Sequence, residues 1–224
     1  MRAPPPAIDG VLFDLDGTLL DSAPDLHAAL VAYADEAGVA APPLERVRPV
    51  VSSGAMAVLR CAFDEDEAAL ARRLPRFLEL YGQRIAQDTR PFAGVPELLQ
   101  QLETRALPWG IVTNKAGALT CALLERIGWR PRLAALVCGD TLPVKKPDPA
   151  PVRLACSQAG IEPSRGVFVG DDRRDVLAGK AAGLYTVAVG WGYLNGGDPM
   201  AWGADCLVER PQDLAALLGL HRAA

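Results

Sequence analysis

The stretch "VLFDLDGTLLDS", residues 11–22, places two aspartates at the end of an apolar run. A single leucine separates Asp14 from Asp16, and Gly17 and Thr18 follow directly. Two like charges this close together at the end of a buried strand destabilise a folded chain unless something offsets their repulsion. A divalent cation would offset it, so we expect a metal ion to bind here.

The composition argues against several classes of protein. The 224 residues, half of them apolar, suffice for one large domain or for one domain with an insertion. A net charge of −4 argues against a nucleic-acid-binding surface. No apolar run approaches the roughly 20 residues of a membrane-spanning helix, and the first ten residues, "MRAPPPAIDG", do not resemble a signal peptide.

The cysteines and histidines indicate the cell compartment and the kind of metal. Five cysteines are scattered without a C-x-x-C pair, which predicts reduced thiols and a cytoplasmic protein. With two histidines in the chain, a zinc site of the His/Cys type is not expected. We therefore expect any metal to be a hard cation bound by oxygen atoms.

Short apolar runs rich in valine and isoleucine alternate with longer amphipathic stretches. The runs predict strands at 10–14, 109–113, 134–138, 165–170, 185–190 and 205–208. The stretches between them predict helices near 95–104, 116–127, 148–159, 173–182 and 211–218. This alternation is typical of an α/β fold, with a Rossmann-like parallel sheet that carries helices on both faces.

Residues 22–90 break this alternation, because they contain no convincing strand. Helical stretches are predicted there at about 24–37, 44–62 and 66–87. We interpret 22–90 as an all-helical cap inserted into a catalytic core formed by 1–21 and 91–224. The alternative is a set of extra helices that pack on the sheet without a functional role.

Polar residues follow four of the predicted strands. Ligands bind beyond the carboxyl ends of the strands in an open parallel sheet. The residues at those ends are Asp14, Asp16, Gly17 and Thr18; Thr113, Asn114 and Lys115; Lys145 and Lys146; and Asp171, Asp172 and Asp175. Four strand ends thus bring carboxylates, hydroxyls and ammonium groups to one crevice, which is stronger evidence than any single motif.

This set of residues is suited to phosphoryl transfer. Asp14 and Asp171, with a main-chain carbonyl, would hold Mg²⁺. Asp14 is also a plausible nucleophile, because carboxylates form aspartyl-phosphate intermediates. Asp16 would protonate the leaving alkoxide and later activate water, provided that it carries a proton. Lys146 and Thr113 would bind the transferred phosphoryl group.

Four motifs in this order resemble those of the haloacid dehalogenase-like (HAD) superfamily: "DLDGT", "IVTNK", "KKPDP" and "VGDDRRD". The resemblance implies that the helical insertion is a cap that opens for substrate and closes to exclude solvent. The metal ligands that it implies are Asp14, the main-chain carbonyl of Asp16, Asp171 and, through water, Asp175.

Other residues near these motifs have a plainer interpretation. Lys146 precedes a proline as in the family's third motif, so its neighbour Lys145 is predicted to be a solvated surface charge. Asp172 either caps the next helix or supports the metal from outside its ligand shell. Arg173 and Arg174 are predicted to face solvent.

The stretch "VRPVVSSGAMAVL" (47–59) in the predicted cap is suited to a polar ligand. Arg48 would meet a carboxylate, whereas Ser52, Ser53 and Gly54 offer hydroxyls and free N–H groups at a helix start. The alternative for these three residues is an ordinary helix cap. Further residues expected to contact substrate are Gly17, Thr18 and Asn114.

Over its whole length the sequence resembles bacterial phosphoglycolate phosphatases and the related N-acetylmuramic acid 6-phosphate phosphatases of cell-wall recycling. The stretches 47–59, 108–115 and 191–214 favour the second group. The resemblance therefore favours N-acetylmuramate 6-phosphate as substrate, with 2-phosphoglycolate as the alternative. Both molecules carry a carboxylate and a phosphate, so Arg48 does not separate them.

Asp16 argues against dehalogenase chemistry, because haloacid dehalogenases lack this second aspartate. Two further alternatives remain open: a phosphosugar mutase and a non-catalytic regulator that binds phosphosugars. The expected partner is a small phosphate ester, and neither nucleic acid nor a membrane is expected. No apolar face is distinctive enough to predict an oligomer.

Overall fold

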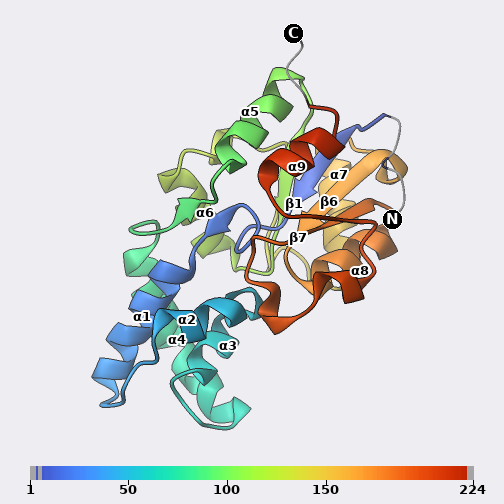
Figure 1. The fold of residues 1–224 in the computed structure, drawn as a ribbon. Coiled ribbons are helices and arrows are strands. Elements are labelled where there is room, and N and C mark those ends of the chain that lie inside the picture. The colour runs from blue at the N-terminus through green and yellow to red at the C-terminus, as the bar shows by residue number, and fades with distance from the viewer. Residues whose placement is uncertain (1–3, 5–6, 221–224) are drawn as a thin grey trace.

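The computed structural model describes residue 4 and residues 7–220. Residues 1–3, 5–6 and 221–224, which the sequence analysis counted as part of the catalytic core, lie outside that description. Six parallel strands of the described chain form one sheet in the order β5-β4-β1-β6-β7-β8 (Figure 1). They are β1 (Gly10–Phe13), β4 (Trp109–Val112), β5 (Ala135–Val137), β6 (Gly166–Gly170), β7 (Tyr185–Val189) and β8 (Cys206–Val208). The predicted α/β fold and its six strands are confirmed.

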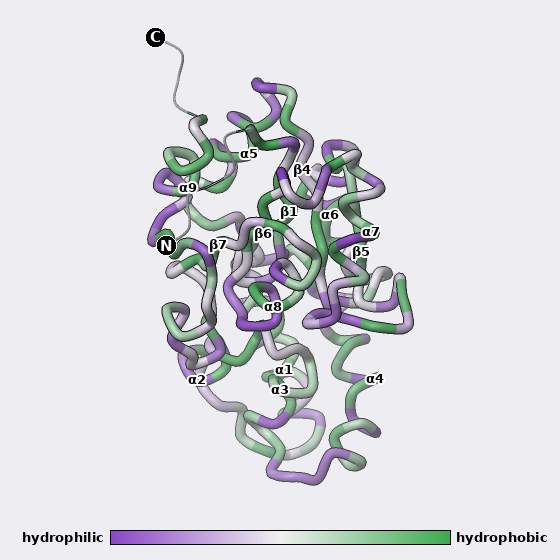
Figure 2. Tube along the Cα trace, turned by 90° about the vertical axis from the view of Figure 1, so that its right-hand side faces the viewer, coloured by the Kyte–Doolittle hydropathy of each residue, from purple (hydrophilic) through white to green (hydrophobic). Residues whose placement is uncertain are grey.

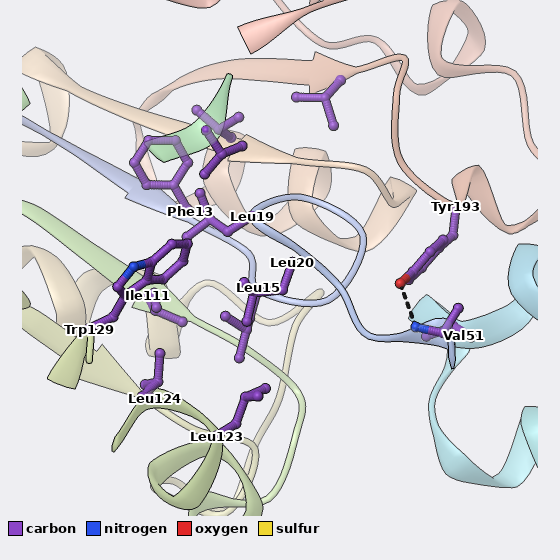
Figure 3. Close-up of a cluster of buried hydrophobic side chains, with 14 of the residues drawn as sticks. Phe13, Leu15, Leu19, Leu20, Val51, Ile111, Leu123, Leu124, Trp129 and Tyr193 are labelled. Atoms are coloured by element: carbon purple, nitrogen blue, oxygen red, sulfur yellow. Dashed lines mark hydrogen bonds between the residues drawn. The ribbon is translucent and has the colours of Figure 1, made fainter. Parts of the chain in front are cut away.

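Helices cover both faces of the sheet, because successive residues of a strand point to opposite sides. Val11 and Phe13 lie in one hydrophobic cluster with residues of α5, α6 and α9, and part of this cluster is drawn in Figure 3. Leu12 lies in a second cluster with residues of α7 and α8. The helices are α5 (Val95–Thr104), α6 (Gly117–Arg126), α7 (Ala150–Ala159), α8 (Arg173–Ala182) and α9 (Pro211–Leu217). Short 3₁₀ turns complete the core at η2 (Arg130–Arg132), η3 (Pro163–Arg165), η4 (Leu194–Gly196) and η5 (Pro199–Trp202).

The cap is all-helical and extends from one end of the core (Figure 1). It consists of α1 (Ala23–Glu36), α2 (Leu44–Val47), η1 (Arg48–Ser53), α3 (Ala55–Arg60) and α4 (Glu67–Arg84). Helix α4 packs against α1 and alternates hydrophobic with hydrophilic residues, as Figure 2 shows. Its buried residues include Leu70, Phe77 and Tyr81.

The single helix predicted over 44–62 is wrong, because the structure divides this stretch into α2, η1 and α3. Pro49 stands at the second residue of the six-residue 3₁₀ turn and cannot donate the hydrogen bond that would continue an α-helix. Gly54 then separates η1 from α3 with φ +90° and ψ 176°, a conformation that favours glycine. The cap therefore presents a jointed segment toward the core.

Two short strands join the cap to the core. β2 (Leu20–Asp21) pairs antiparallel with β3 (Arg90–Pro91), where the chain leaves the core and returns to it. The Asp25 carboxylate accepts hydrogen bonds from the backbone N–H groups of Asp88 (2.8 Å) and Thr89 (3.1 Å) and from the Thr89 hydroxyl (2.6 Å). One buried side chain thus ties the two connections together. The domain limits 22–90 stay a prediction that this pairing supports.

The core loop after β7 also contacts the start of the cap. The Tyr193 hydroxyl accepts a hydrogen bond from the Ala23 N–H (2.9 Å) and donates one to Asp21 (2.9 Å). Arg48 of the cap donates two hydrogen bonds to the same Asp21 carboxylate (2.7 and 2.8 Å). These contacts hold the cap against the core. Across the described ranges, no helix has the length and apolarity to cross a membrane.

Candidate active site

A cavity of about 350 Å³ lies between the carboxyl ends of the strands and the cap. Several elements far apart in sequence contribute to its wall, as the positions of the predicted residues require. The predicted site residues that line it are Asp14, Asp16, Thr113, Asn114, Lys146, Asp175, Ser52, Ser53 and Gly54. The structure therefore brings together most of the residues selected from the sequence.

Three buried carboxylates form a cluster beside the cavity. Asp14 follows β1, Asp171 follows β6, and Asp175 lies in the first turn of α8; one oxygen of each lies within 4.8 Å of the others. Burial raises the pKa of all three carboxyl groups, and the charge of Asp14 raises the pKa of Asp171 further. These are hard oxygen donors, and their concentrated negative charge fits a divalent cation.

Lys146 is the ammonium group at this cluster. Its Nζ lies 2.7 Å from Asp14 Oδ1, 2.7 Å from Asp175 Oδ1 and 2.6 Å from the Val112 carbonyl. Burial opposes the charge of this lysine, but the two carboxylates outweigh it and raise the Lys146 pKa. The Asn114 side chain binds both the N–H (3.1 Å) and the carbonyl (3.0 Å) of Lys146. Asn114 thus supports the lysine, although it was predicted to contact substrate.

Asp16 is held by two residues to which the sequence analysis assigned no role. Its carboxylate accepts a hydrogen bond from the Ser22 hydroxyl, and Lys115 Nζ lies 3.2 Å from both carboxylate oxygens. The lysine in turn lies over the Tyr81 ring of α4, 4.5 Å from its centroid. Burial raises the pKa of Tyr81 to about 12. The position of Lys115 directly after Thr113 and Asn114, at a strand end, was the signal for its place in the site.

Gly17 and Thr18 lie against the Asp171 carboxylate. The prediction had placed them in contact with substrate. The Thr18 hydroxyl donates to Asp171 Oδ1 (3.0 Å), and the Tyr193 N–H donates to Asp171 Oδ2 (2.9 Å). Gly17 has φ +90°, and a Cβ added there would lie 2.2 Å from Asp171 Oδ2. A glycine is needed at this position because the carboxylate approaches the backbone so closely.

The cap reaches the cluster through Ser52. Its hydroxyl donates to Asp171 Oδ2 (2.9 Å) and lies 3.2 Å from the Asp16 carbonyl oxygen. Arg48 was predicted to meet a carboxylate of the ligand, but it pairs with Asp21 and does not line the cavity. The geometry therefore gives no support to a substrate contact by Arg48.

Asp172 and Arg174 begin helix α8. Asp172 is the N-cap residue and forms a capping box with Asp175, which confirms the helix-cap interpretation. The prediction that Arg174 faces solvent is wrong, because Arg174 is half-buried and lines the cavity. Its Nε and Nη2 bind the two oxygens of Asp172 (2.8 and 2.9 Å), and Nη2 also donates to the Ser52 carbonyl (2.5 Å). Arg173 is exposed, as predicted.

The comparisons with known proteins agree with this geometry. The family model for haloacid dehalogenase-like hydrolases matches residues 11–189. The chain belongs to this family. The match covers all four motifs that were selected from the sequence.

Two curated relatives resemble the chain over nearly its whole length. A phosphoglycolate phosphatase of Xanthomonas campestris pv. campestris is 47% identical over 206 residues, which cover 91% of this chain and 93% of that one. An N-acetylmuramic acid 6-phosphate phosphatase of Pseudomonas aeruginosa is 44% identical over 218 residues, covering 94% and 95%. The chain is therefore a phosphatase of the haloacid dehalogenase-like family.

Solved structures show the same fold. A protein of Haemophilus somnus 129PT, described as a predicted phosphoglycolate phosphatase, superposes with a TM-score of 0.84 at 25% identity and covers 94% of this chain and 97% of that one. CbbY from Rhodobacter sphaeroides, solved in complex with phosphate, has a TM-score of 0.76 at 22% identity, covering 95% and 99%. At this identity the second comparison concerns the fold alone.

Proposed function

We propose that this chain is a Mg²⁺-dependent phosphomonoester hydrolase of the cytoplasm that acts on a small acidic phosphometabolite through an aspartyl-phosphate intermediate. The observation that carries the proposal is the buried cluster of Asp14, Asp171 and Asp175 around Lys146, at the end of the cavity. Asp14, Asp171 and the Asp16 carbonyl would hold Mg²⁺, with Asp175 reaching it through water. When bound, the ion supplies charge that polarises the phosphoryl group.

The reaction divides into two displacements at phosphorus. An Asp14 oxygen attacks the phosphoryl group, and the bond to the ester oxygen breaks. Asp16 gives its proton to the departing alkoxide and takes one from the water that then attacks the aspartyl-phosphate, which releases inorganic phosphate and restores Asp14. Lys146 holds Asp14 in place and stabilises negative charge on the transferring group, and Thr113 binds a phosphoryl oxygen.

The favoured substrate is 2-phosphoglycolate. The first two curated relatives given above differ little in identity, 47% against 44%, and the more similar one is named a phosphoglycolate phosphatase. The sequence favoured N-acetylmuramate 6-phosphate, but the relatives support the alternative slightly better. We therefore take the two-carbon ester as the first substrate to test.

N-acetylmuramate 6-phosphate remains a second candidate because of the shape and chemistry of the cavity. The volume of about 350 Å³ lies within the range of sites that enclose larger ligands, about 300–1,000 Å³. A two-carbon ester would leave much of this space to water. The cap side of the wall is largely apolar and includes Leu26, Val51, Met56, Leu74 and Leu78. Such a wall suits the acetyl and lactyl methyl groups of the sugar.

The test is phosphate release from 2-phosphoglycolate and N-acetylmuramate 6-phosphate side by side, with Mg²⁺ and with a chelator. The substrate with the higher kcat/KM in Mg²⁺ is the better supported one. Absence of Mg²⁺-dependent phosphate release from both would overturn the proposal. Conversion of a sugar phosphate without phosphate release would indicate a mutase, and binding without turnover would indicate a regulator.

A further inference from the structure

The cavity holds as many carboxylates as cations, and most of these cations are already engaged. Its charged lining residues are Asp14, Asp16, Asp172 and Asp175 together with Lys115, Lys145, Lys146 and Arg174. Lys146 is bound to Asp14 and Asp175, and Lys115 is bound to Asp16. A substrate with a second negative charge besides its phosphate would be repelled here unless another cation receives it.

Arg174 has an unused set of donors. Its Nε and one Nη atom bind Asp172 side-on, and the same Nη atom donates to the Ser52 carbonyl. Nη1 forms no hydrogen bond with any part of the chain that the structure describes. The guanidinium is planar and rigid, so the Asp172 pair holds Nη1 in a fixed orientation before a ligand arrives.

Arg174 also lies close to the phosphoryl end of the cavity. Ser52 contacts Asp171 through its hydroxyl (2.9 Å) and Arg174 through its carbonyl (2.5 Å). The guanidinium is thus one residue away from the carboxylate cluster. Lys145 is the one charged lining residue with no ion pair among the described residues, and it is exposed.

We propose that Arg174 is a specificity-determining residue that binds the carboxylate of the substrate through Nη1, while Nη2 holds the cap at Ser52. This inference rests on the proposed phosphatase function, but it holds for both candidate substrates because each carries a carboxylate. In place of Arg48, it assigns to Arg174 the recognition of the second charge. Because the same guanidinium contacts the cap, recognition of the acid is coupled to closure.

Matched pairs of substrates test the assignment. Ethyl phosphate is 2-phosphoglycolate with a methyl group in place of the carboxylate, and N-acetylglucosamine 6-phosphate is N-acetylmuramate 6-phosphate without its lactyl acid. kcat/KM is measured in Mg²⁺ for both members of each pair, with the wild-type protein and with Arg174→Gln, Arg174→Lys and Arg173→Gln. Arg173 is the matched control, because it is an exposed neighbour that does not line the cavity.

Loss of one charge-assisted hydrogen bond predicts a fall in kcat/KM on the order of 10- to 100-fold for the carboxylated member in Arg174→Gln. The member without a carboxylate should fall much less, because it loses only the contact of Arg174 with the Ser52 carbonyl, which both members share. Arg174→Lys should restore part of the preference, since it keeps the charge without the fork. Arg173→Gln should behave as the wild type with both members.

Three results would overturn the assignment. The first is equal hydrolysis of both members of a pair by the wild-type protein. The second is an equal loss with both members in Arg174→Gln, as expected of a purely structural contact with the cap. The third is loss of the preference for the acid in Lys145→Gln while Arg174→Gln retains it. Failure of the proposed function is a different result, namely no Mg²⁺-dependent phosphate release by the wild-type protein from any of these esters.

Discussion

The two walls of the cavity are built in different ways. On the core side, the side chains of Lys146 and Asp175 are each 3% exposed and come from the loop after β5 and the first turn of α8. On the cap side, the wall is made of the 3₁₀ turn η1, the start of α3 and residues of α1 and α4. The ion pair of Arg48 with Asp21, which does not line the cavity, is 36% and 26% exposed. The reacting groups thus sit in a buried ionic cluster, whereas the cap contributes backbone atoms, hydroxyls and apolar surface. Such a division allows the cap to vary without disturbing the chemistry.

The largest effect is expected on the core side of the cavity, from loss of the nucleophile. Asp14→Asn should lower kcat on the order of 10⁴-fold or more, because it replaces the attacking carboxylate with a poorly nucleophilic amide and weakens the metal site together. Phosphate release measures the loss, and circular dichroism checks the fold. Asp35→Asn is the control, since Asp35 is an exposed aspartate on α1 of the cap. Substantial turnover by Asp14→Asn would contradict the covalent scheme.

The next effect concerns the buried lysine. Lys146→Met should lower kcat about 10²- to 10³-fold. It should also lower the free energy of unfolding by about 3–5 kcal/mol, because buried carboxylates lose their partner. Urea denaturation measures stability, with Lys145→Met as the control because Lys145 is the adjacent lysine and is exposed. Equal stability of the two variants would mean that the ion pairs of Lys146 contribute no more to the free energy of unfolding than an exposed lysine does.

Metal binding should stabilise the core wall measurably. Mg²⁺ at a hundred times its Kd should add about 2.7 kcal/mol to the free energy of unfolding. For a chain of this size, that raises Tm by roughly 2–4 °C per kcal/mol. Thermal unfolding in Mg²⁺ and in a chelator measures the shift, which Asp171→Asn should largely abolish. An equal shift in Asp171→Asn would place the bound ion elsewhere.

The smallest effect is expected on the cap side. Arg48→Gln should lower the free energy of unfolding by no more than about 1 kcal/mol, because a half-exposed ion pair is screened by solvent. We expect a change of a few-fold at most in kcat/KM. The change should be equal for the members of the substrate pairs with and without a carboxylate. A selective loss with the carboxylated members would assign recognition of the acid to Arg48 and contradict its assignment to Arg174.

The core could be predicted from the sequence because its signals are local. A strand buried on both faces is a continuous apolar run, and the residue after it stands at the sheet edge where ligands bind. Asp14, Lys146 and Asp171 therefore lie together in the structure, as their positions after predicted strands required.

The cap could be predicted only in outline, because its details depend on contacts between distant residues. The apolar periodicity over 44–62 favoured one helix, but Pro49 and Gly54 divide it. The partners of Arg48 and Arg174 were also beyond reach. Each depends on how the cap lies on the core: Arg48 pairs with Asp21, and Arg174 reaches the Ser52 carbonyl.

The carboxylate of Asp25 has a mechanical consequence. It belongs to the first helix of the outgoing segment and holds the backbone of the returning segment at Asp88 and Thr89. The two connections between core and cap are therefore linked to each other at Asp25 and are not independent. Helix α4, with 18 residues, is about 27 Å long and extends away from this point. A small rotation of the cap about Asp25 would displace the far end of α4 much more than the atoms around Asp25.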